Sequence, residues 1–187
     1  MSLELVKPDL RRLPDFVAAL ERGWSPDNVR GAEAARELLD RAATDPAALV
    51  DSFDDPDARA GDIILPDGSR VERLPGFHRW IWDDDFCGVI GFRWRKGTPD
   101  LPAHVLGHVG YAVPPWKRGR GYATGALAAL LPTVAALGLP WVDLTTDPDN
   151  LPSQKVILAV GGYLVERFVK GPAYGGGPGL RYRIDLI

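Results

Sequence analysis

Hydrophobic residues along the chain follow both helical and extended spacing, a mixture that predicts an α/β domain. A short apolar strand covers residues 3–6, and apolar positions then recur at helical spacing over 9–22. Segment 32–43 is rich in Ala, Glu and Arg, which favours a second helix. Further along, residues 120–137 carry a single leucine- and valine-rich stripe, which predicts a third helix.

The middle of the chain changes to an extended pattern. Residues 78–82 and 86–94 read as two strands joined by the turn Asp83–Asp85, and together they predict a hairpin. The three aspartates lack the alternating ligands and the closing glutamate of a calcium loop, so turn chemistry explains them and no metal is expected.

The remaining elements complete a mixed, mostly antiparallel central sheet of six to seven strands flanked by about four helices. They are predicted strands at 105–113, 141–145, 163–169 and 182–186, a helix at 150–160, and irregular segments at 51–67 and 171–179.

The length of 187 residues suits one domain. Within it, residues 1–75 supply an N-terminal strand and helices, and residues 76–187 supply the rest of the sheet.

Composition narrows the class of protein. The formal charge of −3 and the pI of about 5.6 give no basic excess, so neither nucleic acid nor an anionic membrane is an expected partner. Cys87 is the only cysteine, which excludes an internal disulfide and a zinc site built from cysteines. The N-terminus lacks the features of a signal peptide, and no apolar run approaches the length of a membrane span. We therefore expect a soluble cytoplasmic protein. Its oligomeric state stays open, a homodimer included.

The segment from Tyr111 to Thr124 has the order of an anion-binding site: a strand end, a glycine turn and the first turn of a helix. Gly119 and Gly121 let the backbone take conformations that other residues resist. The first amides of the following helix have no acceptor within the helix, so a phosphate can receive them.

Three phosphate-binding patterns compete for this segment. A nucleotide P-loop requires Gly-Lys-Ser/Thr, which is absent. A dinucleotide fingerprint requires glycine where Thr124 stands, and the glycine comes one place late at Gly125. The third pattern, Arg/Gln-x-x-Gly-x-Gly/Ala, fits residues 118–123 throughout. It resembles the pyrophosphate-binding motif of the GNAT superfamily of N-acetyltransferases.

The resemblance extends from about Trp80 to the C-terminus and includes Arg93, which ends a predicted strand. It is closest to a branch of acetyltransferases that share four further motifs. Here these motifs read Gly107-His-Val-Gly-Tyr111, Arg118 to Thr124, Asn150 to Ile157, and Gly161-Gly162. Residues 1–75 resemble that branch only in outline.

The resemblance implies a GNAT fold, acetyl-CoA as co-substrate and a primary amine as acceptor. It makes residues 76–187 the acetyl-CoA-binding core and places the acceptor beside the N-terminal helices. Main-chain groups of one strand would hold the acetyl and pantetheine parts, the glycine loop the pyrophosphate, and two polar side chains the pantetheine arm. These groups are Tyr111, Ala112 and Val113 for the strand, Arg118, Gly119, Arg120, Gly121, Tyr122, Ala123 and Thr124 for the loop, and Asn150 and Ser153 for the arm. Asn150 and Ser153 are equally good helix caps.

His108 is the candidate general base, because it stands where many members of the superfamily carry a glutamate, and a neutral imidazole accepts a proton near pH 7. A structural or substrate-orienting role is the alternative, and Glu72 and Asp143 are weaker candidates. Many members also carry a tyrosine where this chain has Ile157, so the usual donor of a proton to the departing thiolate is missing. Tyr122 and Tyr163 are the available substitutes.

Two other functions stay open at this stage. A CoA-binding sensor that has lost turnover would explain the missing tyrosine. A nicotinamide-dependent oxidoreductase would explain a glycine loop, but the dinucleotide fingerprint fails at Thr124.

Overall fold

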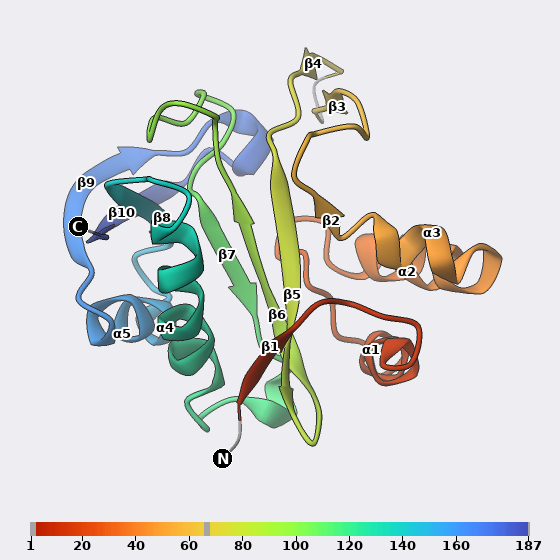
Figure 1. The fold of residues 1–187 in the computed structure, drawn as a ribbon. Helices are drawn as coiled ribbons and strands as arrows, with labels where there is room; N and C mark the ends of the chain where they lie inside the picture. The colour runs from red at the N-terminus through yellow and green to blue at the C-terminus, as the bar shows by residue number, and fades with distance from the viewer. Residues whose placement is uncertain (1–2, 66–67, 187) are drawn as a thin grey trace.

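The computed structural model describes residues 3–65 and 68–186, which form two antiparallel sheets with helices against them (Figure 1). The first sheet has the order β1-β5-β6-β7, with β2 paired to β5, and the second has the order β8-β10-β9. A separate two-stranded ribbon pairs β3 with β4. The strands are β1 Glu4–Val6, β2 Asp54–Asp55, β3 Ile63–Ile64, β4 Arg70–Val71, β5 Gly76–Asp83, β6 Asp85–Arg93, β7 Val109–Ala112, β8 Trp141–Thr146, β9 Tyr163–Val169 and β10 Pro178–Asp185.

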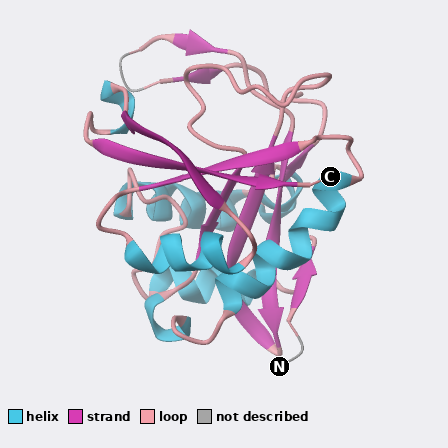
Figure 2. Cartoon of the chain, turned by 90° about the vertical axis from the view of Figure 1, so that its left-hand side faces the viewer, coloured by secondary structure: helices cyan, strands magenta, loops and turns pink. Residues whose placement is uncertain are grey.

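Five α-helices occur in the described residues, and they divide between the two sides of the first sheet (Figure 1). The helices are α1 Leu13–Glu21, α2 Ala32–Thr44, α3 Pro46–Asp51, α4 Tyr122–Ala135 and α5 Leu151–Ala159. The helices α1, α2 and α3 lie on one side, and α4 and α5 on the other. Figure 2, seen from the side of α4 and α5, shows the strands of the second sheet above these helices. None of the helices in the described ranges has the length and apolar character needed to cross a membrane.

Period-two alternation along β6 explains why the first sheet has a core on each face. Ile90 and Phe92 point into the cluster that contains α4 and the second sheet. Val89 points into the cluster formed with α1, α2 and α3, where Phe16 of α1 stacks on Trp80 at a centroid distance of 5.2 Å. Both faces of this sheet are therefore covered.

The predicted fold class is confirmed, although the strands divide between two sheets rather than one. The hairpin of β5 and β6 is present, and its turn places Asp84 at φ +64°. The largest differences from the predicted boundaries are that α1 begins at Leu13, β7 covers only Val109–Ala112, and β10 begins at Pro178, inside the glycine-rich segment. The short strands β2 and β3 lie in a segment predicted to be irregular.

The helix α3 was not predicted. It begins with Pro46 after the cap Asp45, whose carboxylate accepts from the Ala48 amide at 2.9 Å.

Candidate active site

A cleft opens where β7 and β8 separate. Just before β7, the His108 amide donates to the Asp143 carbonyl at 2.7 Å, and the Asp143 amide donates to His108 Nδ1 at 2.9 Å. Gly107 lets the chains approach here, because a Cβ at this position would lie 3.0 Å from the Asp143 carbonyl oxygen. Beyond this contact β7 and β8 no longer pair, and they belong to different sheets.

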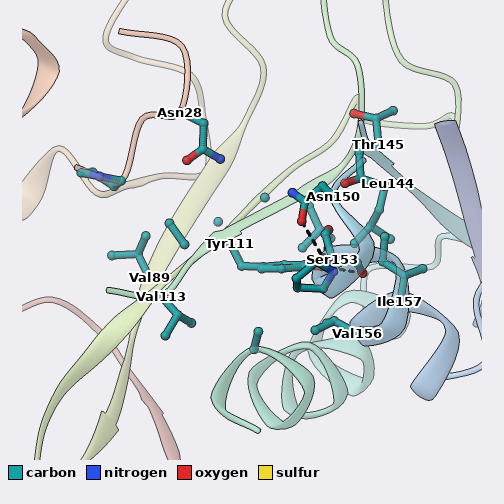
Figure 3. Close-up of a pocket in the computed structure, with 18 of the residues that line it drawn as sticks. Asn28, Val89, Tyr111, Val113, Leu144, Thr145, Asn150, Ser153, Val156 and Ile157 are labelled. Carbon is teal, nitrogen blue, oxygen red and sulfur yellow. Dashed lines mark hydrogen bonds between the residues drawn. The ribbon is translucent and has the colours of Figure 1, made fainter. Parts of the chain in front are cut away.

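The cleft has a volume of about 1160 Å³ and reaches from the start of α4 to the segment between α1 and α2. Figure 3 shows Val89 and Val113 on one side, Val156 and Ile157 on the other, and Tyr111 between them. Asn28, from the α1–α2 segment, lies across the cleft from Ser153. The volume is sufficient for an extended ligand.

The glycine loop lies at one end of this cleft. Gly119 and Gly121 have φ values of +75° and +80°, and a Cβ on either would meet no atom within 4 Å. Glycine is therefore needed at these two positions for its backbone conformation and for the open space it leaves, not for a close contact within the protein. The first internal hydrogen bond of α4 joins the Gly125 amide to the Gly121 carbonyl. In the described part of the chain, no amide from Gly119 to Thr124 donates to a residue outside α4.

Two arginines of the predicted loop differ from the other loop residues. Arg118 lines the cleft, but its amide donates to the Pro115 carbonyl and its Nε to the Val113 carbonyl at 3.1 Å. It therefore shapes the loop instead of presenting a free donor. Arg120 is exposed and does not line the cleft.

Tyr111, Asn150 and Ser153 meet at the centre of the cleft (Figure 3). Asn150 caps α5, and its side-chain oxygen accepts from the Ser153 amide at 3.2 Å. The Tyr111 hydroxyl and Ser153 Oγ lie 2.9 Å apart in a hydrogen bond. Burial raises the pKa of Tyr111, so its hydroxyl stays protonated. The sequence does not predict this hydroxyl pair, because Tyr111 and Ser153 are 42 residues apart.

The tyrosine substitutes considered for position 157 lie elsewhere. Ile157 lines the cleft wall and is otherwise fully buried. Tyr122 lines the cleft, but its hydroxyl donates to Asp83 at 3.0 Å, and burial raises its pKa to about 12. Tyr163 lies outside the cleft lining and donates to Asp185 at 3.2 Å. The hydroxyl pair of Ser153 and Tyr111, by contrast, lies at the centre of the cleft and is bonded to no carboxylate in the described residues.

His108 lies in the contact between the two sheets, fully buried and outside the cleft lining. Its Nδ1 already accepts the Asp143 amide, so the ring proton belongs on Nε2. Desolvation lowers the pKa of His108, which keeps the ring neutral. The prediction that His108 is the base is not tested by this geometry, but the observed contacts suit a structural role.

The weaker candidate bases are also occupied or distant. Asp143 accepts two hydrogen bonds from Arg183, at 2.8 and 2.9 Å. Glu72 is exposed beside Arg95 at 3.8 Å, and it does not line the cleft.

Two cleft residues of the first sheet complete the site, His78 of β5 and Arg93 of β6. The sequence analysis names Arg93 only as part of the resemblance, and it gives His78 no functional role. Period-two alternation puts both side chains on the face that α1 and α2 cover. The sequence offered that alternation, but it did not reveal which face meets the cleft.

Several solved structures with the same fold are acetyltransferases. The ribosomal alpha-N-protein acetyltransferase RimL, in complex with coenzyme A, has a TM-score of 0.63 at 14% identity, covering 98% of this chain and 93% of that one. The microcin self-immunity acetyltransferase MccE, in complex with acetyl-CoA and AMP, has a TM-score of 0.61 at 13% identity, covering 98% and 92%. A GNAT-family acetyltransferase from Bacillus anthracis has a TM-score of 0.59 at 16% identity, covering 98% and 95%. These likenesses show the fold.

The family follows from the sequence itself. The model of the acetyltransferase (GNAT) domain matches residues 32–162, which is well over half of the chain. No protein of curated function matches the sequence. The chain belongs to the GNAT acetyltransferase family and is an N-acetyltransferase.

Proposed function

We propose that this protein transfers the acetyl group of acetyl-CoA to a primary amine by direct attack of the amine on the thioester. The observation that supports this proposal most strongly is that the amides from Gly119 to Thr124 donate no hydrogen bond outside α4 and that this loop lines the cleft between β7 and β8. A pyrophosphate at this helix start would receive those amides and meet the positive end of the α4 dipole.

The residues present fit such a co-substrate. Glycine at 119 and 121 leaves open space where a side chain would stand, so the phosphates could approach the main chain. From there the cleft continues past Val113 and Ala112 to Tyr111, along the edge of β7 that β8 leaves unpaired. That edge offers main-chain groups to the amides of a pantetheine arm and to the thioester carbonyl.

The reaction requires one bond to form and one to break. The amine nitrogen bonds to the thioester carbon and gives its proton to a base or to solvent water, and the carbon–sulfur bond breaks as the sulfur leaves as thiolate. Alignment of the two reactants in the cleft would supply a large part of the acceleration.

Ser153, hydrogen-bonded to Tyr111, is the residue we assign to protonate the thiolate. The pair stands at the centre of the cleft, and Tyr111 can replace the proton that Ser153 gives up. A thiol pKa near ~8.5 makes the thiolate a tolerable leaving group, so this donor assists transfer without being essential. This donor would take the place of the tyrosine that many members of the superfamily carry where this chain has Ile157.

His108 stays a predicted base. Direct contact with the acceptor is difficult for a ring that is fully buried and whose Nδ1 is occupied. A water that reaches Nε2 would be needed for the ring to take the proton. The alternative we favour is that His108 fixes the point at which β7 and β8 separate.

Two experiments test the function. Acetyl-CoA at one hundred times its Kd should stabilise the fold by about 2.7 kcal/mol and raise the Tm by roughly 5–10 °C, and NAD should not. An unchanged Tm at millimolar acetyl-CoA would show that acetyl-CoA is not the co-substrate. Release of free CoA with a panel of amines should then separate an enzyme from a sensor, which would bind acetyl-CoA and release none.

A further inference from the structure

Arg93 is an unpaired cation in the cleft. Among the described residues, five lysines and arginines line the cleft: Arg93, Lys117, Arg118, Lys155 and Lys170. Lys117 pairs with Asp85, Lys170 donates to Asp147 at 2.7 Å, and Arg118 donates to a carbonyl. Lys155 of α5 is exposed and, among the described residues, has no carboxylate partner either. In the described ranges the guanidinium of Arg93 has neither a carboxylate nor a carbonyl partner.

The surroundings of Arg93 are those of a prepared site rather than of the open surface. Its side chain is exposed to the cleft, but nearby protein atoms desolvate it, and this desolvation lowers its pKa. Tyr174 also lines the cleft, but its hydroxyl donates to the His104 carbonyl at 2.7 Å. A guanidinium without an ion-pair partner keeps its donors available to a bound anion.

The sheet beside Arg93 carries two glycines. Gly91 pairs with His78 on one side and with Gly110 on the other, so neither glycine adds a side chain of its own. The imidazole lies over Gly91, where a Cβ would come within 2.8 Å of Nε2, and Nη2 of Arg93 lies 3.6 Å from a Cβ placed on Gly110. The guanidinium therefore faces open cleft directly above β7.

This position lies on the acceptor side. Asn28 of the α1–α2 segment and Arg93 both line the cleft, and Arg93 stands on the sheet face that α1 and α2 cover. Gly110 is one residue from Tyr111 and three from Val113, so at a rise of about 3.4 Å per residue the guanidinium stands within about 10 Å, measured along β7, of the strand edge assigned to the thioester.

We propose that the amine acceptor carries an anionic group, which Arg93 binds. A carboxylate fits best, because the planar guanidinium can bind its two oxygens together. The proposal rests on the proposed function for the identity of the reacting group, but binding of the anion does not depend on turnover.

The neighbouring His78 reports on that anion. Desolvation and then the charge of Arg93 lower the pKa of His78 to about 4, so the ring is neutral at pH 7. An anion on Arg93 cancels part of that charge, and the pKa of His78 must then rise.

Turnover is tested with ω-amino acids from glycine to 6-aminohexanoate, each paired with its amide, and with phosphoethanolamine against ethanolamine. Rates are compared at equal concentrations of free amine. The wild type should favour carboxylates over amides by about tenfold or more in kcat/KM, with the best acceptor among the shorter members, since a charged hydrogen bond is worth ~1.5–3 kcal/mol. Preference for phosphoethanolamine alone would assign the anion as a phosphate.

Variants at Arg93 separate this role from packing. Arg93→Gln should abolish the preference and leave amides within about threefold of the wild type, and Arg93→Lys should restore part of it. Arg95→Gln, two residues along and outside the cleft lining, should keep the full preference. Equal wild-type rates with carboxylates and amides, or equal losses for both in Arg93→Gln, would overturn the proposal and leave the acetyltransferase function intact.

Binding without turnover is measured by NMR titration of the His78 ring with β-alanine and with its amide. The pKa of His78 should rise with β-alanine alone, and the rise should vanish in Arg93→Gln. If the shift occurs but no amine releases CoA, the anion site stands and the proposed function fails. If β-alanine and its amide act alike, the anion site is wrong.

Discussion

Gly121 provides the sharpest test of the glycine loop, because the same helix carries a matched control. Gly121 begins α4 at φ +80°, and Gly138 follows α4 at φ +82°. A Cβ on either glycine would meet no atom within 4 Å. Gly121→Asp and Gly138→Asp should therefore carry a similar conformational cost, at most about 1–2 kcal/mol.

The effect on binding should differ greatly between the two variants. At residue 121 the new carboxylate would stand where the pyrophosphate should lie. Two unit charges 4 Å apart at an effective dielectric of 20 repel by about 4 kcal/mol, which corresponds to a loss of ~10³ in affinity. In bulk water the same pair gives about 1 kcal/mol, or roughly fivefold, and this sets the lower bound.

Stability cannot explain such a loss. A carboxylate at the start of α4 interacts favourably with the helix dipole, and one at its end unfavourably, so Gly121→Asp should be the more stable variant. Calorimetric titration with acetyl-CoA, with Tm values of both unliganded variants, gives the comparison. Undiminished affinity in Gly121→Asp, or an equal loss in Gly138→Asp, would refute the placement of the pyrophosphate.

Two further substitutions test the assigned hydroxyl and the buried imidazole. Ser153→Ala should lower kcat about tenfold or more, with little change in the Kd for acetyl-CoA, because a positioned acid is worth ~10²–10⁴; an unchanged kcat would leave Ser153 a helix-cap residue. His108→Ala leaves the buried Asp143 amide unpaired and opens a cavity, so it should cost about 2–4 kcal/mol and lower the Tm. Because burial lowers the pKa of His108 in the folded state, the wild type should lose stability as pH falls below ~6.5, and His108→Ala should lose less. If His108 is the base, the rate of acetyl transfer should rise with pH at pH values below ~6.5, and this rise should not follow the acceptor's own pKa. The rise should vanish in His108→Ala. A rise that persists in His108→Ala would show that the base is another group.

Much of the fold could be predicted because its signals are local. The alternation and the Asp83–Asp85 turn gave the hairpin of β5 and β6, and the apolar stripe gave α4 to within two residues at each end. The glycine loop was recognisable because its conformation demands glycine at residues 119 and 121.

What escaped prediction depends on contacts between distant segments. A strand pattern does not state its partners, so the separation of β7 from β8 could not be foreseen. His108 looked available as a base because nothing in its own segment reveals the amide of Asp143. Tyr111 and Ser153 are 42 residues apart, and only the fold brings their hydroxyls together.

The central claim is amine acetylation, and mass spectrometry of the amine tests it most directly. Wild-type protein, acetyl-CoA and a panel of carboxylate-bearing and neutral amines should yield at least one amine heavier by one acetyl group, with an equal amount of free CoA. Gly121→Asp should give far less product at the same acetyl-CoA concentration. Hydrolysis of acetyl-CoA without any acetylated amine, or acetyl-CoA that stays intact while bound, would contradict the account.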